Sequence, residues 1–393
     1  MNVVLGGLIA RFPLGGVAID YLQYVLGFER LGCEVFYLED TGQYCYDPAE
    51  QTFTPDCSRN FAYLTRTLAR YGIGEGRFCL RNWDGTCHGV GHERLLEVLR
   101  AAELFVNVSG TCWLRDEYRE MRMRKVFIDS DPGYNQVWIA LGSRPQAERK
   151  LAAAVERIKA HDDHFTFAEN IGGPGASLPP TPGIRWRTTR QPIVLDLFEP
   201  RGPFSARELY TTVMNWSPHG YELEYEGRRY GGKAAPFLRY VGLPERFGKR
   251  FEVALAGRAP REQLKAAGFV IVDAALVSAN PERYLDYLAT SRGEWSVAKE
   301  VYTAMRTGWF SGRSACYLAL GRPVIVEDTG FSPYYPCGSA IFPFSNEDDV
   351  GAALETIDGD YEKTCRAARE VAEACFDARR VLGAILEHSA EEH

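Results

Sequence analysis

A glycine- and serine-containing loop at residues 308–314 (GWFSGRS) combines residue types that bind an anionic group. The loop opens a helical pattern that ends at Gly321. Amide groups at a helix start have no partner within the helix, and the helix dipole adds about half a positive charge there. With Ser311, Arg313 and Ser314 beside these amides, the segment predicts a site for a phosphate or diphosphate group. The alternative is an ordinary capped helix with Arg313 in solvent.

The elements that would position this loop follow a regular alternation. Short apolar runs that end in turn residues alternate with helical patterns along the chain, which is typical of parallel strands connected by crossover helices. The expected strands are residues 2–5, 35–38, 104–108, 125–128, 164–168, 212–215, 251–255, 270–272, 323–326 and 340–342. In open α/β sheets ligands bind beyond the carboxyl ends of the strands, so the polar loops that follow these strands are the candidate sites.

Residues 172–192 are rich in glycine and proline and form the best linker in the chain. The sequence therefore predicts two α/β domains, each a doubly wound parallel sheet of the Rossmann-like type, that face a cleft. The expected boundaries are 1–185 for the first domain and 186–365 for the second, followed by a helical segment at 366–393.

The composition excludes several classes of protein. The 393 residues carry a net charge of -7, which speaks against a general nucleic-acid partner and leaves room for a local anion pocket. No apolar run approaches the roughly 20 residues that span a bilayer, and the amino terminus lacks the pattern of a signal peptide. We therefore expect a cytoplasmic protein with no integral membrane segment. Cys87, His88 and His92 have no second ligand pair to complete a metal site.

The segment GWFSGRSACYLALGRPVIVEDTGF resembles the donor-binding segment of GT-B fold glycosyltransferases, the nucleotide-sugar-dependent family 1 and 4 type. In that superfamily a glycine/serine loop, a helix and a G-x-P-V-I strand precede an acidic or amide pair near the donor sugar. The resemblance is strongest over residues 292–357 and extends more weakly to the amino-terminal GGLIARFPLGGVAIDYLQYVLGFERLGCEVFYLED. It implies the GT-B architecture, with a nucleotide-sugar donor on the second domain, an acceptor on the first, and a C-terminal helix at 366–393 that crosses back to the N-terminal domain.

The resemblance also implies roles for individual residues. Small and basic residues would hold the donor diphosphate: Gly15, Gly16, Arg258, Ser311, Gly312, Arg313 and Ser314. Residues around two strands of the second domain would contact the donor sugar or ribose: Lys299, Glu300, Glu327, Asp328 and Thr329. A solvated turn is the alternative for Glu327 and Asp328, and an exposed helix surface is the alternative for Lys299 and Glu300. The sequence departs from the family pattern at Tyr317, which stands where many members bind the ribose with a glutamate.

Three aspartates are candidates for the base that an inverting transferase needs within reach of the acceptor hydroxyl. Asp20 lies in the first turns of the first helix, where many family members carry a histidine or an aspartate. Asp129 and Asp131 flank a serine directly after the strand at 125–128. A helix-start carboxylate is the alternative for Asp20, and turn-forming aspartates are the alternative for the pair. If none of them is the base, the donor phosphate would take the proton and configuration would be retained.

These patterns predict a hexosyltransferase-like glycosyltransferase. It would move a sugar from a nucleotide-diphosphate sugar, UDP or dTDP sugar, to a small-molecule or glycan acceptor. We expect no cofactor and no metal ion, because a helix start and Arg313 would neutralise the diphosphate. A nucleotide-sugar epimerase of the same fold and a catalytically silent paralogue that serves as a binding subunit are the alternatives. A homodimer is left open.

Overall fold

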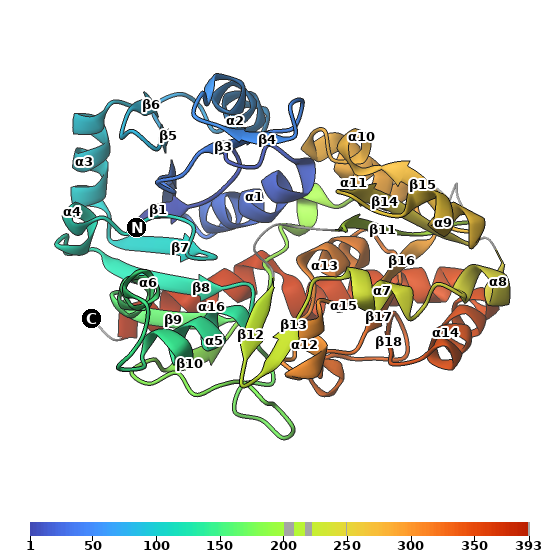
Figure 1. Ribbon diagram of the computed structural model, residues 1–393. Coiled ribbons are helices and arrows are strands. Elements are labelled where there is room, and N and C mark those ends of the chain that lie inside the picture. Colours follow the sequence, from blue (N-terminus) through green and yellow to red (C-terminus); the bar gives the residue numbers. More distant parts are fainter. Residues whose placement is uncertain (200–207, 217–221, 249, 392–393) are drawn as a thin grey trace.

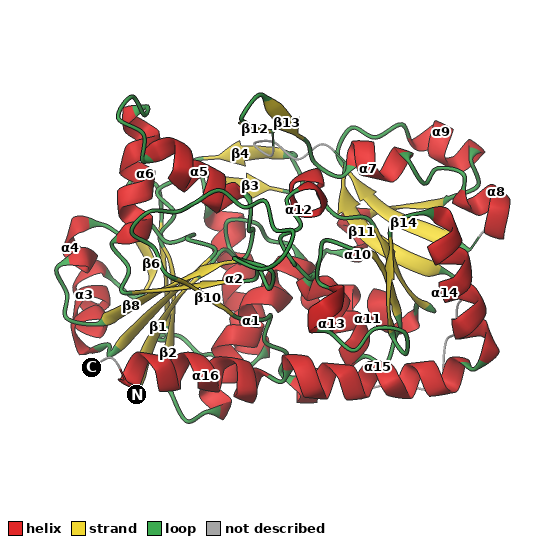
Figure 2. Cartoon of the chain, turned by 90° about the horizontal axis from the view of Figure 1, so that it is seen from below, coloured by secondary structure: helices red, strands yellow, loops and turns green. Residues whose placement is uncertain are grey.

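The computed structural model describes residues 1–199, 208–216, 222–248 and 250–391. Two separate β-sheets lie side by side, and helices flank each of them (Figures 1 and 2). Their strands are short and mostly buried, as expected for parallel sheets that helices cover on both faces. The described elements thus form two α/β domains.

The first domain is built on an eight-stranded sheet in the order β10-β9-β8-β7-β1-β2-β5-β6. Its strands are β1 (Asn2–Gly6), β2 (Glu34–Glu39), β5 (Phe78–Arg81), β6 (Cys87–Gly89), β7 (Leu104–Val108), β8 (Arg124–Asp129), β9 (Asp163–Thr166) and β10 (Trp186–Thr188). All neighbours are parallel except β5 and β6. The helices are α1 (Gly15–Arg30), α2 (Ser58–Arg70), α3 (His92–Ala101), α4 (Asp116–Arg119), α5 (Tyr134–Gly142) and α6 (Arg149–Lys159), and β3 (Cys45–Asp47) pairs with β4 (Thr52–Thr54) in a hairpin.

The second domain is built on a six-stranded parallel sheet in the order β15-β14-β11-β16-β17-β18. Its strands are β11 (Tyr210–Asn215), β14 (Phe251–Ala256), β15 (Val270–Asp273), β16 (Gly293–Ser296), β17 (Val324–Glu327) and β18 (Ile341–Phe344), and a hairpin joins β12 (Leu223–Tyr225) to β13 (Arg228–Tyr230). The α-helices are α7 (Ala234–Leu238), α8 (Leu243–Phe247), α9 (Arg261–Ala266), α10 (Ala274–Val277), α11 (Pro281–Thr290), α12 (Glu300–Ala304), α13 (Gly312–Ala319), α14 (Glu347–Gly359), α15 (Tyr361–Phe376) and α16 (Ala378–Glu391). Short 3-10 turns cover Leu195–Leu197 and Ser332–Tyr334.

The chain changes sheets later than the sequence indicates. Strand β10 pairs in parallel with β9, so the first sheet continues past the expected boundary at residue 185. Strand β16 was not expected, because Glu294 interrupts its apolar pattern. In the structure Glu294 is fully buried, and the Arg313 guanidinium balances its charge at 2.8 Å. A charged residue can therefore occupy the middle of the second sheet.

The C-terminal segment consists of two helices with a break at Asp377. Helix α15 packs its Phe376 into the core of the second domain, and α16 packs Leu382 into the core of the first. The crossing back to the first domain is therefore confirmed, but it begins at Ala378 rather than at residue 366. Gly27 of α1 permits this packing, since a Cβ there would lie 2.5 Å from Leu382 Cδ1. No helix of the described residues has the length and apolar character that crossing a membrane requires.

Candidate functional site

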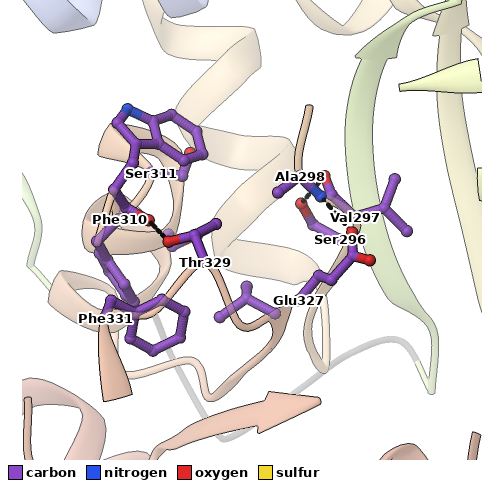
Figure 3. Close-up of a pocket in the computed structure, with 11 residues that line it drawn as sticks. Ser296, Val297, Ala298, Phe310, Ser311, Glu327, Thr329 and Phe331 are labelled. Atoms are coloured by element: carbon purple, nitrogen blue, oxygen red, sulfur yellow. Dashed lines mark hydrogen bonds between the residues drawn. The ribbon is translucent and has the colours of Figure 1, made fainter. Parts of the chain in front are cut away.

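A pocket lies at the carboxyl ends of β16 and β17, beside the start of α13 (Figure 3). Its lining comes from three segments of the second domain: Ser296, Val297, Ala298, Trp309, Phe310, Ser311, Ser314, Val326, Glu327, Thr329 and Phe331. Four of these are candidates from the sequence: Ser311, Ser314, Glu327 and Thr329. The pocket therefore occupies the edge of the sheet at which open α/β folds bind ligands.

The start of α13 leaves hydrogen-bonding groups open toward this pocket. Ser311 precedes the helix with extended backbone, and no side chain caps the helix. The first amides of α13 consequently have no acceptor within the helix. Ser314, in the first turn, is fully buried, and its hydroxyl has no hydrogen-bond partner among the described residues. Leaving a buried hydroxyl unpaired costs free energy, so Ser314 and the open amides indicate a place for the oxygen atoms of a ligand.

Arg313 turns away from solvent and uses its donors on the protein. Its Nε donates to Glu294 at 2.8 Å, Nη1 donates to the Val213 carbonyl at 2.7 Å, and Nη2 donates to Ser296 Oγ at 2.9 Å. The side chain is only 13% exposed. The alternative that placed Arg313 in solvent is therefore wrong. Direct contact between Arg313 and a diphosphate stays a prediction, because the guanidinium donates its hydrogen bonds to these protein groups.

Lys233, just before α7, is a charged residue of this region that we did not single out from the sequence. Burial and the nearby Arg313 lower the pKa of its ammonium to about 7, although Glu294 and Glu327 oppose the shift. An anion beside the ammonium would favour the charged form. The local pattern Gly-Gly-Lys at 231–233 was the available signal, since glycines allow a ligand to approach the backbone closely.

Glu327 stands at the end of β17 and lines the pocket. Its Oε2 accepts a hydrogen bond from the Ala298 amide at 3.0 Å (Figure 3). Its Oε1 accepts one from Arg239 at 2.6 Å. Burial raises the pKa of this carboxyl, and the Ala298 amide and Arg239 oppose the rise. Each carboxylate oxygen can still accept another hydrogen bond, which a ligand hydroxyl could supply.

The next two residues have different surroundings. Asp328 accepts hydrogen bonds from the Gly330 amide and from Ser332 Oγ, both at 2.9 Å, and so closes a turn. It is not among the residues that line the pocket. Thr329 lines the pocket, is buried, and donates its hydroxyl hydrogen to the Trp309 carbonyl at 2.6 Å. Glu327 and Thr329 therefore belong to the candidate sugar site, whereas Asp328 forms a turn.

Lys299 and Asp131, predicted for different roles, meet across the two domains. Lys299 Nζ lies 2.6 Å from Asp131 Oδ1, and the Tyr302 hydroxyl donates to the same oxygen. Burial alone would raise the pKa of Asp131, but Lys299 and the hydrogen bonds from Lys299 and Tyr302 hold it below its usual range. A carboxylate this acidic is a poor proton acceptor. Glu300 points elsewhere and accepts a hydrogen bond from the Gly231 amide at 3.0 Å.

Asp129 holds the turn after β8. Its Oδ1 accepts a hydrogen bond from Asn135 at 2.7 Å, and its Oδ2 accepts bonds from Gln136 at 2.8 Å and Thr166 at 2.7 Å. The side chain is fully buried, and burial raises the pKa of its carboxyl against the effect of these bonds. The structure does not support a base role for Asp129, because the carboxylate is buried and both of its oxygens are engaged.

Asp20 is the only one of the three aspartates that lies against the start of α13. A Cβ placed on Gly312 would be 3.4 Å from Asp20 Oδ1. The Asp20 side chain is exposed, and Gly312 of the second domain lies beside it. Desolvation raises the pKa of Asp20 to about 7, and the Arg313 charge opposes this rise. Asp20 is therefore an accessible carboxylate with the pKa that suits a general base near neutral pH.

The glycines that begin α1 serve the contact between the domains. The Gly15 amide donates to the Ser278 carbonyl at 2.7 Å, and a Cβ on Gly15 would clash with the Asn280 carbonyl. A Cβ on Gly16 would lie 3.1 Å from the Tyr284 ring. These glycines let α1 approach the second domain closely. The Gly15 amide is thus occupied, and the structure gives neither glycine a contact with the pocket.

Two further residues lie away from the pocket. Tyr317 is fully buried, and its hydroxyl lies 2.5 Å from Thr211 Oγ1 in the core. Burial and Glu294 raise the pKa of its hydroxyl, and Arg313 opposes the rise. Arg258 is exposed in the loop after β14. Among the described residues, no cluster of three or more His, Cys, Asp or Glu side chains is arranged to hold a metal ion.

The two domains and the pocket at the start of α13 define an α/β protein with a candidate anion site on its second domain. No protein-family model matches the sequence, and no curated protein matches it. Solved structures do match. An α-glucosyltransferase, AGT, in complex with UDP has a TM-score of 0.57 at 9% identity, over 99% of this chain and 100% of that chain. Sucrose-phosphate synthase from Thermosynechococcus elongatus has a TM-score of 0.52 at 10% identity, over 100% of both chains.

Anabaena HepE in complex with UDP and glucose has a TM-score of 0.56 at 10% identity, over 99% of each chain. At such low identity the likeness concerns the fold. This chain has the GT-B fold, with two Rossmann-like parallel-sheet domains and a C-terminal helix that crosses back, as the resemblance in the sequence predicted.

Proposed function

We propose that this protein is a glycosyltransferase that takes a sugar from a UDP sugar and transfers it to a hydroxyl group held by the first domain. The observation that carries the proposal is the unpaired, buried Ser314 hydroxyl at the uncapped start of α13, in a pocket at the carboxyl ends of β16 and β17. The AGT and HepE structures contain UDP, which supports uridine diphosphate as the leaving nucleotide.

In this proposal the donor diphosphate lies against the start of α13. The open amides and the Ser311 and Ser314 hydroxyls donate hydrogen bonds to phosphate oxygens. Lys233 supplies a positive charge in its protonated form. Arg313 keeps its ion pair with Glu294 and supports the start of α13 from below. In this proposal these donors neutralise the diphosphate without a metal ion.

The donor sugar extends from the diphosphate toward β17. Glu327 has free acceptor capacity on both carboxylate oxygens, so it can bind two hydroxyl groups of the sugar. Thr329 lines the same wall of the pocket. Trp309 and Phe310 supply apolar surface that excludes water beside the reacting carbon, which favours transfer over hydrolysis.

Asp20 is the base in this mechanism, and the reaction inverts the configuration of the donor sugar. As the acceptor oxygen forms its bond to the anomeric carbon, its proton passes to the Asp20 carboxylate. The bond between that carbon and the phosphate oxygen breaks, and UDP leaves with the electron pair. The pKa of about 7 lets Asp20 accept a proton readily and release it to solvent after transfer.

Isothermal titration with UDP, followed by a donor-consumption assay with a panel of UDP sugars, tests the proposal. We expect saturable UDP binding and turnover of at least one UDP sugar to an inverted product. Absence of UDP binding would overturn the donor site. An isomerised nucleotide sugar formed without acceptor would show the epimerase alternative instead.

A further inference from the structure

A second group of exposed side chains lies on the first domain, outside the pocket described above. It contains four aromatic residues that are each between 42% and 44% exposed: Tyr44, Phe53, Trp83 and Trp113. Tyr44 and Phe53 follow β2, Trp83 follows β5, and Trp113 follows β7. These strands are close in the sheet order β7-β1-β2-β5, so their carboxyl ends lie along one edge. Exposed aromatic residues gathered in this way usually mark a binding surface.

Direct contacts join the loops that carry these rings. The ring centroids of Tyr44 and Trp83 are 5.2 Å apart in an edge-on arrangement. The Trp113 ring packs on Gly42, where a Cβ would clash with it. Tyr44, Gly42 and their neighbours thus connect Trp83 on one side with Trp113 on the other.

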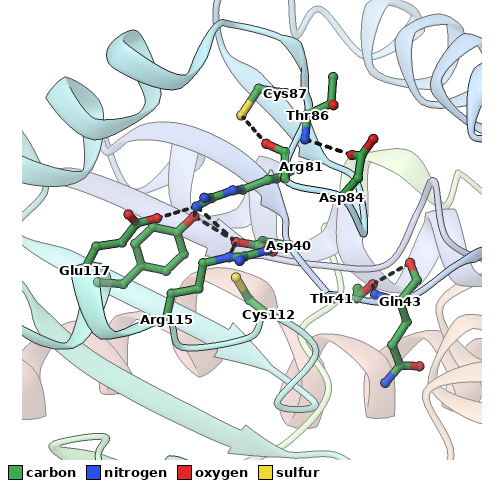
Figure 4. Close-up of polar contacts among 12 residues, drawn as sticks. Asp40, Thr41, Gln43, Arg81, Asp84, Thr86, Cys87, Cys112, Arg115 and Glu117 are labelled. Atoms are coloured by element: carbon green, nitrogen blue, oxygen red, sulfur yellow. Dashed lines mark hydrogen bonds and ion pairs between the residues drawn. The ribbon is translucent and has the colours of Figure 1, made fainter.

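Arg11 extends the same surface toward the β3–β4 hairpin. Its guanidinium lies 5.5 Å from the centroid of the Phe53 ring. It donates to Thr41 Oγ1 at 3.2 Å and to the side-chain oxygen Oε1 of Gln43 (Figure 4 shows Thr41 and Gln43). We use the name aromatic platform for Arg11, Tyr44, Phe53, Trp83 and Trp113. The platform thus combines four exposed aromatic rings with one guanidinium group.

An ionic network centred on the buried Asp40 connects the platform loops (Figure 4). Asp40, directly after β2, is fully buried and accepts two bonds from Arg115, at 2.6 and 2.7 Å, and one from Tyr118 at 2.8 Å. Arg81, at the end of β5, lies 3.7 Å from Asp40 and also pairs with Glu117. Because these residues come from the segments after β2, β5 and β7, the network fixes three loops relative to one another. A surface ordered in advance loses less entropy when it binds a ligand.

We propose that the aromatic platform binds the extended part of an oligosaccharide acceptor, an inference that rests on the proposed glycosyltransferase function. The hydrocarbon faces of sugars pack on aromatic rings, while planar side chains such as Arg11 and Gln43 bind their hydroxyl groups. The platform spans the carboxyl ends of β7 to β5, three strand spacings or roughly 14 Å. Such a length exceeds one sugar ring and fits a chain of sugars better than a single planar molecule.

The loop that contains Arg11 connects the platform to α1, the helix that carries Asp20. Phe12, beside Arg11, contacts the Phe53 ring with centroids 5.9 Å apart, and the same loop leads into α1, which carries Asp20. A chain of sugars on the platform therefore runs along the loop that precedes α1. Its terminal hydroxyl would reach the Asp20 carboxylate while the remaining sugars pack on the rings.

A second connection runs from the loop of Trp113 to the donor pocket. Ser109, at the start of that loop, lies 2.5 Å from Ser130 through the two hydroxyl oxygens. The Ser130 carbonyl accepts a hydrogen bond from Trp309 Nε1 at 3.0 Å, and Trp309 lines the pocket. The edge of the first sheet is thus continuous from the platform to the donor site.

A nucleic-acid acceptor is a competing occupant, since one AGT structure contains a 13-mer DNA together with UDP. Binding of DNA depends on several contacts between cations and phosphates. The platform and its neighbours include two arginines that already stack on rings, Arg11 on Phe53 and Arg157 on Trp113. With a net charge of -7, the chain favours a neutral glycan.

The experiment compares Trp83→Ala and Tyr44→Ala with the matched control Trp138→Ala. Trp138 is 39% exposed on α5 and is not part of the platform. The full-length proteins are applied to an array of neutral and charged oligosaccharides and of DNA oligonucleotides, and hits are titrated by calorimetry. We expect an oligosaccharide ligand whose affinity grows with chain length and falls about tenfold in either platform variant, since each loses a packed aromatic ring. Trp138→Ala should stay within about twofold of the wild type.

Two outcomes overturn the inference. In the first, no oligosaccharide on the array binds in a manner that depends on Trp83. In the second, only a DNA oligonucleotide binds in that manner. UDP titrations on the same samples keep this test separate from the proposed function. UDP binding without a platform-dependent glycan overturns the inference alone, whereas loss of UDP binding in the wild type overturns the proposed function. Equal thermal unfolding midpoints of the three variants show that a lost affinity is not lost folding.

Discussion

The start of α13 and the turn after β8 are two polar regions linked by one hydrogen bond, from Trp309 Nε1 to the Ser130 carbonyl. They differ in how their polar atoms are used. At α13 the Ser314 hydroxyl is buried without a partner among the described residues. In the turn, the buried Asp129 carboxylate accepts bonds from Asn135, Gln136 and Thr166.

This difference separates a binding site from a structural support. Buried polar groups in folded proteins are nearly always paired, so an unpaired one that lines a pocket is a candidate ligand contact, whereas a fully paired one stabilises the fold. The same distinction applies to the exposed carboxylates. Asp131 is held by Lys299 and has a pKa below its usual range, whereas Asp20 has a pKa raised to about 7. The following variants test this contrast.

The largest effect is expected for Asp20→Asn. Loss of the base should lower kcat/KM for sugar transfer by about 100-fold or more. UDP affinity should be unchanged or higher, because a negative charge beside the anion site is removed. Steady-state kinetics and calorimetry measure the two effects. The matched variant Asp131→Asn should lose less than about tenfold, since Asp131 is a paired residue. Equal losses in both variants would contradict the assignment of the base.

Asp129→Ala should act on stability. It leaves the donors of Asn135, Gln136 and Thr166 buried without their acceptor, which we expect to cost about 3 kcal/mol in the free energy of unfolding. Urea denaturation followed by fluorescence measures the change. An Asp129→Ala protein as stable as the wild type, but unable to transfer sugar, would return Asp129 to the list of catalytic residues.

The contrast also explains how much the sequence could predict. Alternating strands and helices, the helix that ends at Gly321 and the polar loop before α13 depend on local patterns, and the structure has these elements. The role of Arg313 was not accessible, because its partner Glu294 lies on β16, a strand that local apolarity does not indicate. Pairing between segments that are distant in sequence decides which donors are free for a ligand.

The same limit applies to the aspartates and to Lys233. Spacing suggested that Asp129 and Asp131 could be catalytic, but Thr166 and Lys299, from other strands and the other domain, occupy them. Lys233 comes near the pocket only through the packing of α7 against the second sheet. The candidate site was therefore predictable as a place in the fold, whereas the state of each side chain required the tertiary structure.

The pH dependence should show the two shifted groups separately. Asp20 must be deprotonated to act as base, so kcat/KM should fall about tenfold per pH unit below its pKa of about 7. Lys233 carries its charge below a pKa of about 7, so UDP affinity should weaken as the pH rises above that value. Kinetics measure the fall in kcat/KM, and calorimetry measures the fall in UDP affinity, from pH 5.5 to 8.5, about 1.5 units on either side of that value. Asp20→Asn should lose only the acidic limb, and Lys233→Met only the alkaline weakening of UDP binding.

The smallest effect, and the one that bears most directly on the contrast, is expected for Ser314→Ala. Removal of one hydrogen bond to the diphosphate should raise the Kd for UDP about fivefold. The free energy of unfolding should stay the same or rise by less than about 1 kcal/mol, because an unpaired buried hydroxyl is removed. Ser389→Ala is the matched control: Ser389 on α16 is also buried with an unpaired hydroxyl. If both variants change stability alike and only Ser314→Ala weakens UDP binding, the unpaired hydroxyl at α13 is a ligand contact. If UDP binding is the same in both, an unpaired polar atom is not evidence of a binding site in this protein.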